Sequence, residues 1–211
     1  MFAVLFEVQP KSEKWDEYLG IAKMLKPELE AIDGFVENIR YRSLTRPGWL
    51  LSLSLWRDEK ALVRWRTQAV HHAAQEKGRF EVFGDYHLRV GELEGSGSTE
   101  RGDATEVGKG TTVVLIDAKQ IADQVKETPP EEIAASLGLR SEAAGLVAWD
   151  VFDAILSPGD VMLMMTARDQ RAAEAMSARE GARLRRVRIL RDYGMYDRRE
   201  APQYYPDVAR R

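Results

Sequence analysis

Short segments rich in alternating or continuous hydrophobic residues recur along the chain, and they predict β-strands. Residues 2–8 form the first such segment. Both of its faces are largely apolar apart from Glu7, so we expect a strand that is covered on both sides. Residues 36–44, 50–56 and 85–93 have a similar character and predict three further strands.

Helical periodicity fills the gaps between these strands. A first helix is predicted to begin near Ser12 with an apolar stripe at three- and four-residue spacing, and Pro27 is predicted to break or restart it. A second helix is predicted over residues 59–77, with Gly78 as its stop. The two stripes consist of Trp15, Tyr18, Leu19 and Ala22, and of Leu62, Trp65, Ala69, His72 and Ala73.

The same order of elements occurs twice in the chain. Residues 34–62 align without a gap on residues 145–173, which lie 111 positions further on, and a Pro-Gly turn, a strand and an Arg-Asp pair recur at the same places. Asp58 and Asp169 are thereby placed to cap equivalent helices. The second copy is about 14 residues shorter, and the loss falls around residues 66–84 of the first copy.

These patterns divide the chain into two domains. We expect a ferredoxin-like β-α-β-β-α-β domain over residues 1–93, a linker over residues 94–110, a second, shortened repeat over residues 111–199 and a tail over residues 200–211. The predicted fold class is α+β, with two ferredoxin-like repeats forming an α+β barrel. The favoured arrangement packs both sheets within one chain, and the alternative pairs each repeat with its counterpart in a second chain.

Several stretches of the first copy resemble the antibiotic biosynthesis monooxygenase (ABM) domain of the dimeric α+β barrel superfamily. They are LLSLSLW at residues 50–56, the RDEKALVRW that follows, HHAAQEKGR, and the predicted strand DYHLRVGEL. The resemblance covers residues 1–93 directly and residues 111–199 only through the internal repeat. The family includes cofactor-free monooxygenases of aromatic polyketides, haem-degrading enzymes and domains without an established reaction, and the shared fold does not choose among them.

Trp65 falls where the family has a pocket tryptophan. The resemblance implies that its ring forms a wall of the pocket and that its N–H binds a substrate oxygen. His72 lies seven residues later on the same predicted helix face, whereas His71 points about 100° away, so we expect His72 to face inward. Such a histidine would act as a general acid or base, or as a haem ligand. The alternatives are a core tryptophan and a half-exposed histidine near the helix end.

The resemblance also implies a comparison with the haem-degrading relatives, which use an Asn on the first strand, a Trp on the second helix and a His about three turns further on. Trp65 matches, but position 75 is Gln, and the Asn position reads Glu7 or the residue after it. Two of the three residues are missing, which counts against haem degradation. Haem bound by His71 or His72 stays as the alternative cofactor, and otherwise we expect none.

Two polar residues on predicted strands are further candidates for catalysis. Glu7 stands on an otherwise apolar face, where burial would raise its pKa and let it act as a base near neutral pH. The alternatives are an ion pair with a neighbouring-strand arginine such as Arg40 or Arg42, or simple exposure. Asn38 would hold a ketone or peroxide oxygen, unless it only satisfies a strand end. Candidate walls of the substrate pocket, besides His71, are the aromatic residues Tyr41, Trp56, Phe83 and Tyr86, for which core packing is the alternative.

Composition narrows the chemistry further. The chain contains no cysteine and three histidines, which excludes thiol nucleophiles and Fe–S ligation. A net charge of −3 gives no attraction to nucleic acid, no segment is apolar for long enough to span a membrane, and the N-terminus has no signal-peptide pattern. We therefore expect a cytoplasmic protein without a metal, and a small aromatic substrate, O₂ and a second copy in a homodimer as its partners.

The two copies differ where the candidate pocket residues stand. The second copy has Met176 in place of Trp65 and lacks the histidine pair, so we expect the reaction site in the first copy, with the second as scaffold and lid. The leading hypothesis is an oxygenase without metal or flavin that acts on an aromatic or polyketide-like molecule, with Glu7 or His72 as the base. A haem-binding protein and a non-catalytic small-ligand or assembly module are the alternatives. The tail after residue 200 is expected to dock on a surface.

Overall fold

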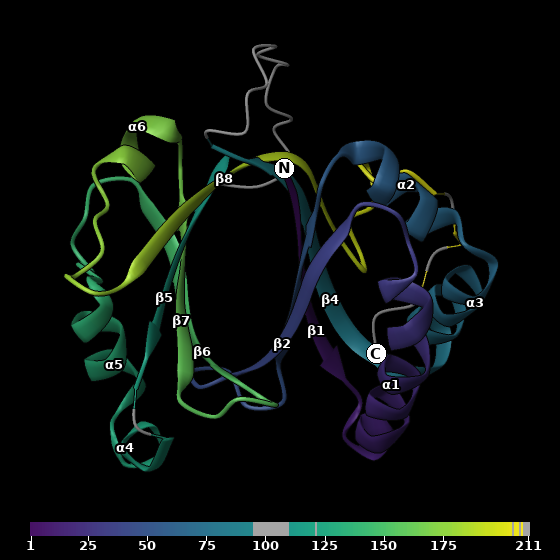
Figure 1. Ribbon diagram of the computed structural model, residues 1–211, viewed down its shortest axis with the longest axis horizontal. Coiled ribbons are helices and arrows are strands. Elements are labelled where there is room, and N and C mark those ends of the chain that lie inside the picture. The colour runs from purple at the N-terminus through teal and green to yellow at the C-terminus, as the bar shows by residue number, and fades with distance from the viewer. Residues whose placement is uncertain (95–109, 121, 204, 207, 209–211) are drawn as a thin grey trace.

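The computed structural model describes residues 1–94, 110–120, 122–203, 205, 206 and 208. The predicted linker over residues 94–110 therefore lies almost wholly outside the described residues. Within the described part, the chain forms two successive repeats with the strand and helix order that the sequence predicts (Figure 1).

The N-terminal repeat contains four strands and, between them, the longer helices of the protein. Its strands are β1 (Phe2–Pro10), β2 (Phe35–Ser43), β3 (Leu50–Trp56) and β4 (Phe83–Leu93). Its helices are the 3₁₀ turn η1 (Ser12–Lys14), α1 (Trp15–Glu30), α2 (Glu59–Thr67), α3 (Ala69–Lys77) and the π-helical turn η2 (Gly78–Val82). Helices α1, α2 and α3 lie together on the outer side of this sheet (Figure 1).

The C-terminal repeat has the same strand order but shorter helices. Its strands are β5 (Thr112–Lys119), β6 (Leu146–Ala154), β7 (Asp160–Ala167) and β8 (Arg183–Gly194), and its helices are α4 (Ala122–Glu127), α5 (Pro130–Leu137) and α6 (Gln170–Glu174). Asp169 caps α6 as Asp58 caps α2, each by accepting a hydrogen bond from a backbone N–H at 2.8 Å. The equivalent caps confirm the match between the two repeats at these helices.

The eight strands form one closed barrel in the order β1-β3-β2-β6-β7-β5-β8-β4. Each repeat contributes an antiparallel sheet of four strands, and the two sheets join along β2 with β6 and along β4 with β8. Because both seams lie within one chain, the favoured within-chain arrangement is confirmed. The helices of the two repeats lie on opposite outer sides of the barrel (Figure 1).

Two helices differ from their sequence predictions. Helix α1 continues through Pro27 to Glu30, because a proline near a helix end removes a single late hydrogen bond. The helix predicted over residues 59–77 is instead divided into α2 and α3 at Gln68, which has an extended conformation (φ −64°, ψ 131°). The Gln68 side chain accepts a hydrogen bond from the backbone N–H of His71 and so caps α3.

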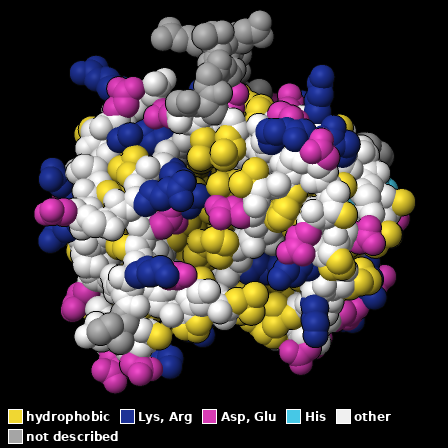
Figure 2. All heavy atoms as spheres, viewed as in Figure 1, with side chains coloured by type: hydrophobic (Ala, Val, Ile, Leu, Met, Phe, Trp, Pro, Cys, Tyr) yellow, Lys and Arg dark blue, Asp and Glu magenta, His cyan; other side chains and the backbone are white. Residues whose placement is uncertain are grey.

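Packed hydrophobic side chains form one core inside the barrel and another beneath the C-terminal helices. Leu5, Leu53 and Phe152, from both repeats, are at most 1% exposed inside the barrel. Ile133 and Leu163 belong to the core beneath α5. At one end of the barrel, hydrophobic side chains gather between the two repeats and charged side chains surround them (Figure 2). None of the helices in the described part of the chain is long and apolar enough to cross a membrane.

Candidate active site

A pocket of about 230 Å³ lies between the outer face of the N-terminal sheet and helices α1 to α3. Side chains alternate between the two faces of a strand, so every second strand residue points into this pocket. The strand residues that line it are Val4, Phe6, Asn38, Arg40, Ser52, Ser54, Phe83, Tyr86, Leu88 and Val90, together with Arg191 and Tyr193 of β8. Their neighbours Leu5 and Glu7 face the barrel interior instead.

Trp65 and His71 lie against each other in this pocket. Their ring centroids are 4.0 Å apart and the ring planes are inclined by 13°. The interruption of the helix at Gln68 allows this stack, because α2 ends there and α3 begins in a new direction. In a continuous helix His72 would share the face of Trp65, but here His72 is exposed and His71 lines the pocket. The expectation that His72 faces inward is therefore wrong.

Hydrogen bonds and burial define the state of the His71 ring. Its Nδ1 lies 2.9 Å from the backbone oxygen of Trp65. A carbonyl oxygen only accepts, so Nδ1 carries the hydrogen and Nε2 carries the lone pair. Burial lowers the pKa of His71 to about 4, and the ring is neutral at pH 7.

Gln75 and Tyr205 extend this arrangement to the tail. Gln75 Nε2 lies 3.1 Å from His71 Nδ1 and 3.4 Å from His71 Nε2, and Tyr205 Oη donates to Gln75 Oε1 over 3.4 Å. Pro202 and Gln203 of the tail also line the pocket. The tail therefore docks on the pocket of its own chain. The sequence marked Gln75 only as the residue that replaces a histidine of haem-degrading relatives.

Asn38 lies in the pocket, but its amide hydrogens are used within the protein. Its Nδ2 donates to Ser52 Oγ over 2.9 Å and to the backbone oxygen of Leu53 over 3.1 Å. Asn38 is therefore placed to orient the Ser52 hydroxyl, which no sequence motif singled out. Phe83 and Tyr86 line the pocket at the other side, with ring centroids 6.1 Å apart.

Two of the predicted pocket walls lie outside the pocket. Tyr41 faces the barrel interior and is 4% exposed. Trp56 is fully buried, packs edge to face on Phe35 and donates from Nε1 to Ser54 Oγ over 2.9 Å. Both residues have the core packing that was their alternative interpretation.

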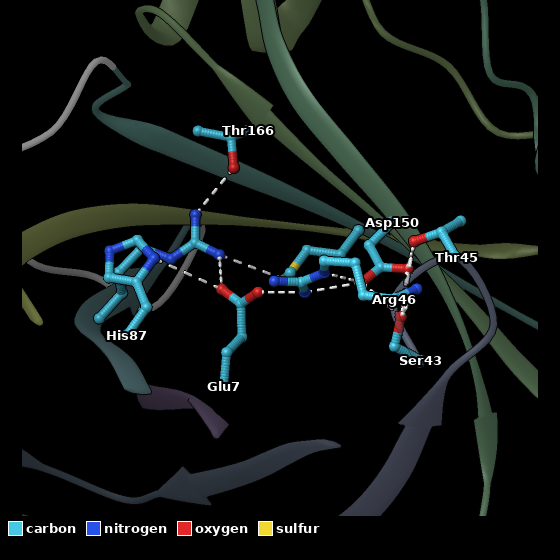
Figure 3. A network of polar contacts seen from close by, with 9 residues as sticks. Glu7, Ser43, Thr45, Arg46, His87, Asp150 and Thr166 are labelled. Carbon is cyan, nitrogen blue, oxygen red and sulfur yellow. Dashed lines mark hydrogen bonds and ion pairs between the residues drawn. The ribbon is translucent and has the colours of Figure 1, made fainter. Parts of the chain in front are cut away.

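Glu7 also lies outside the pocket, on the barrel face of the sheet (Figure 3). Its carboxylate accepts from Arg89 Nη2 over 2.6 Å and from Arg46 Nη2 over 2.5 Å. Burial opposes ionisation, but the positive charges beside the carboxylate outweigh it and hold the pKa of Glu7 below its usual value. The raised pKa expected for a base is therefore wrong, and the arginine partners are Arg46 and Arg89 rather than Arg40 or Arg42.

The Glu7 network borders a second cavity of about 470 Å³ inside the barrel. Arg46 Nε donates to Asp150 over 2.7 Å, and His87 shares a hydrogen bond with Asp192. Both arginines that line this cavity, Arg46 and Arg89, bind a carboxylate. The polar groups of the barrel interior thus neutralise one another (Figure 3).

The outer pocket contains arginines with neutral partners. Arg79 is 3% exposed and donates to Tyr86 Oη over 3.0 Å and to the backbone oxygen of Met195 over 2.9 Å. Arg198 donates to the same Tyr86 hydroxyl. The other charged residues of the pocket lining are Arg40, Arg66, Arg191 and Glu59. Arg79 belongs to the segment that the second copy lacks. This deletion is the one feature of the sequence that indicates a role for Arg79 in the pocket.

The comparisons with known proteins identify the family of this chain. The family model described as antibiotic biosynthesis monooxygenase matches residues 1–77. A curated relative, the jasmonate monooxygenase ABM of Pyricularia oryzae (strain 70-15), is 49% identical over 222 residues, which cover 99% of this chain and 100% of the relative. This chain belongs to the ABM family.

Solved structures similar to this ABM-family chain have low sequence identity to it. Aldoxime dehydratase in complex with butyraldoxime has a TM-score of 0.53 at 12% identity and covers 90% of this chain and 79% of its own. An anthrone oxidase-like protein has a TM-score of 0.32 at 14% identity, with 96% of each chain covered. The first of these similarities supports the fold alone.

Ligands for a cofactor are few in this ABM-family pocket. In the part of the chain that the structure describes, no three His, Cys, Asp or Glu side chains gather as a metal site requires. Haem needs a histidine nitrogen that is free to bind iron. His71 Nδ1 is bound to the oxygen of Trp65, and Gln75 Nε2 lies 3.4 Å from His71 Nε2, while His72 is exposed. A haem ligated by His71 Nε2 from within the pocket would have to displace Gln75, as would any other ligand of that nitrogen.

Proposed function

We propose that this protein is an ABM-type monooxygenase that oxidises a small, largely apolar molecule with O₂ in the pocket of the N-terminal repeat. The observation that carries the proposal is a neutral His71 held against Trp65 inside a pocket covered by α1 to α3 and the tail. The family and the name of the 49% identical relative support the reaction class.

His71 is the base in this proposal. Because Nδ1 is bound to the oxygen of Trp65, Nε2 presents the lone pair that takes a proton from the substrate, once the substrate has displaced Gln75 Nε2 from its position 3.4 Å away. The low pKa keeps Nε2 unprotonated at neutral pH. The negative charge left on the substrate offsets the cost of an imidazolium in a buried position. Glu7 and His72 do not line the pocket, so neither is proposed as the base.

The substrate supplies the electrons for the reaction. After proton loss, the carbanion or phenolate passes one electron to O₂, and the two radicals combine to form a C–O bond. The peroxide takes up the proton and loses water, so that a CH₂ group and O₂ become a C=O group and H₂O. The protein excludes water and offers hydrogen-bond donors to the oxygen, for which Trp65 Nε1 and Ser52 Oγ are the candidates in the pocket.

The substrate proposal combines the sequence prediction with the relative's name. An aromatic or polyketide-like substrate was predicted, and the relative is named for a jasmonate. A jasmonate has a ring ketone, and a ketone makes the C–H bonds beside it acidic, so the same base chemistry applies. We therefore propose two test substrates, a phenolic anthrone and jasmonic acid. Jasmonic acid is called the test acid below.

Oxygen uptake by the purified chain with each test substrate examines the proposal. His71→Asn is expected to lower kcat at least about 100-fold, in line with the loss of a general base. The matched control is His72→Asn, which changes the exposed neighbour and is expected to leave kcat unchanged. Unaltered uptake by His71→Asn would remove His71 as the base, and no uptake with either substrate would contradict the oxygenase itself.

Haem binding by His71 or His72 has less support than cofactor-free oxidation. A titration with hemin decides between the two. Hemin is added to the wild type, to His71→Ala and to His72→Ala, and the Soret band is followed. We expect no shift that depends on either histidine. A Soret shift that one of the two substitutions abolishes would establish a haem-binding role and contradict cofactor-free oxidation.

A further inference from the structure

Three buried arginines in the described part of the chain differ in whether a carboxylate neutralises them. Arg89 and Arg185 are 3% and 8% exposed, and they bind Glu7 and Asp117 over 2.6 and 2.7 Å. Arg79 is also 3% exposed, but no carboxylate of the described residues lies within 4.0 Å of it. A guanidinium keeps its charge at all physiological pH values, so burial without a counter-ion is costly.

The partners of Arg79 are neutral oxygens. Its Nη1 donates to Tyr86 Oη and to the backbone oxygen of Met195, and its Nη2 donates to the backbone oxygen of Pro206 over 3.3 Å. Its Nε is buried and has no hydrogen-bond partner, as is also true of the Nε atoms of Arg89 and Arg185. Arg79 therefore differs from these two arginines in its charge, which no carboxylate of the described residues neutralises.

A second guanidinium converges on the same point. Arg198 donates to Tyr86 Oη, the oxygen that Arg79 also binds. The Arg198 guanidinium lies 5.5 Å from the ring centroid of Tyr193 and 5.1 Å from that of Tyr205, so aromatic rings hold it in place. Two like charges meeting at one neutral oxygen repel each other, and an anion bound between them would be stabilised by both.

The wider lining of the pocket has the same imbalance of charge. Five arginines line it against one carboxylate, that of Glu59. None of these five arginines has a carboxylate of the described residues within 4.0 Å, whereas Arg89 and Arg185 each bind one. Most other lining residues are apolar, among them Phe6, Leu25, Leu62, Leu88 and Val90. The pocket thus combines an apolar space with a cationic wall.

We propose that the pocket binds an apolar molecule that carries a carboxylate, and that Arg79 and Arg198 hold this carboxylate beside Tyr86. The inference rests on the proposed function in one respect, because it assigns the charge of the substrate for the same pocket. It also gives the C-terminal repeat a part in the site, because β8 and the segment after it supply Tyr193 and Arg198. The two arginines are positioning residues for the carboxylate.

A purely structural role for Arg79, in which it fastens the tail through Met195 and Pro206, is the alternative that the experiment must separate. That role would not distinguish an acid from its ester. The probes are therefore two matched pairs, the test acid with its methyl ester and decanoic acid with methyl decanoate, titrated calorimetrically into the full-length wild type and its variants.

The wild type is expected to bind each acid at least about tenfold more tightly than its ester, which corresponds to one charge-assisted hydrogen bond. Arg79→Met and Arg198→Gln are each expected to abolish this preference while the affinity for the ester stays unchanged. Arg79→Lys is expected to restore part of it, because the charge returns without the planar guanidinium. Arg64→Gln, on the exposed side of α2, is the matched control and is expected to keep the full preference.

Equal binding of acid and ester by the wild type, no binding of either acid, or an intact preference in both Arg79→Met and Arg198→Gln would overturn the proposal. If Arg79→Met fails to fold, the acid-over-ester preference of Arg198→Gln tests the same proposal. Oxygen uptake separates this inference from the proposed function. A preference for acids without uptake of O₂ would support the carboxylate site and contradict the proposed oxygenase. Uptake of O₂ with the phenolic substrate, without a preference for acids, would support the oxygenase and contradict the carboxylate site.

Discussion

The two faces of the N-terminal sheet carry opposite arrangements of charge. On the barrel face, Glu7 is bound by Arg46 and Arg89, and the polar groups neutralise one another. In the pocket on the other face, Arg79 of η2 and Arg198 of the segment after β8 share the neutral hydroxyl of Tyr86. The arginines buried on the barrel face have carboxylate partners within the chain, whereas the pocket has an excess of positive charge that a ligand can neutralise. Charge pairing thus separates groups that stabilise the fold from groups available for binding.

The largest expected difference between the two faces concerns the matched arginines Arg89 and Arg79, each 3% exposed. Arg89→Met is expected to lower the free energy of unfolding by about 3–5 kcal/mol, because it breaks a buried ion pair and leaves Glu7 with less compensation. Arg79→Met is expected to change it by no more than about 1 kcal/mol, because the loss of hydrogen bonds is offset by removal of an unneutralised buried charge. Urea unfolding measures both. Equal losses in the two variants would break the comparison.

Leucines on the two faces give the next largest difference. Leu53 is 1% exposed in the barrel core, and Leu53→Ala is expected to cost roughly 3–4 kcal/mol because it opens a cavity among packed side chains. Leu62 lines the pocket, and Leu62→Ala is expected to cost less than about 1.5 kcal/mol because it only enlarges a space that already exists. The same unfolding measurement applies. A cost for Leu62→Ala as large as that for Leu53→Ala would show that the pocket is packed like a core.

The division of the sheet into two faces follows from patterns that the sequence contains. Ala3, Leu5 and Glu7 alternate with Val4 and Phe6, and the structure places the two sets on the barrel and pocket faces. The internal repeat predicted two ferredoxin-like units, and these close into one barrel. Alternation and repetition are local or periodic signals, so one sequence is enough to recognise them.

The chemistry of the pocket depends on features without such a signal. The break between α2 and α3 occurs at Gln68, with no proline or glycine to mark it, and a shift of one position turns a helical side chain by about 100°. For this reason His72 was expected where His71 lies. The backbone partners of Arg79 are 116 and 127 positions away along the chain, at Met195 after β8 and at Pro206 in the tail, and no local pattern predicts them.

A buried but neutral histidine on the pocket face predicts a dependence of stability on pH. Burial lowers the pKa of His71 to about 4, whereas the unfolded chain has the ordinary value of 6.5. Between these two values the unfolded state binds more protons than the folded state, so stability falls as the pH drops from about 6.5 towards 4. The contribution of His71 at full extent is roughly 3 kcal/mol, from about 1.4 kcal/mol for each pKa unit.

The neighbouring histidines provide a matched pair to measure this contribution. Urea unfolding at pH 7 and at pH 4.5 gives the loss of stability for the wild type, for His71→Gln and for the exposed neighbour in His72→Gln. His71→Gln is expected to lose less stability on acidification than the wild type, and His72→Gln is expected to follow the wild type. If all three lose the same amount, His71 is not held neutral by the pocket, and the proposal that it acts as a base from a desolvated position fails with it.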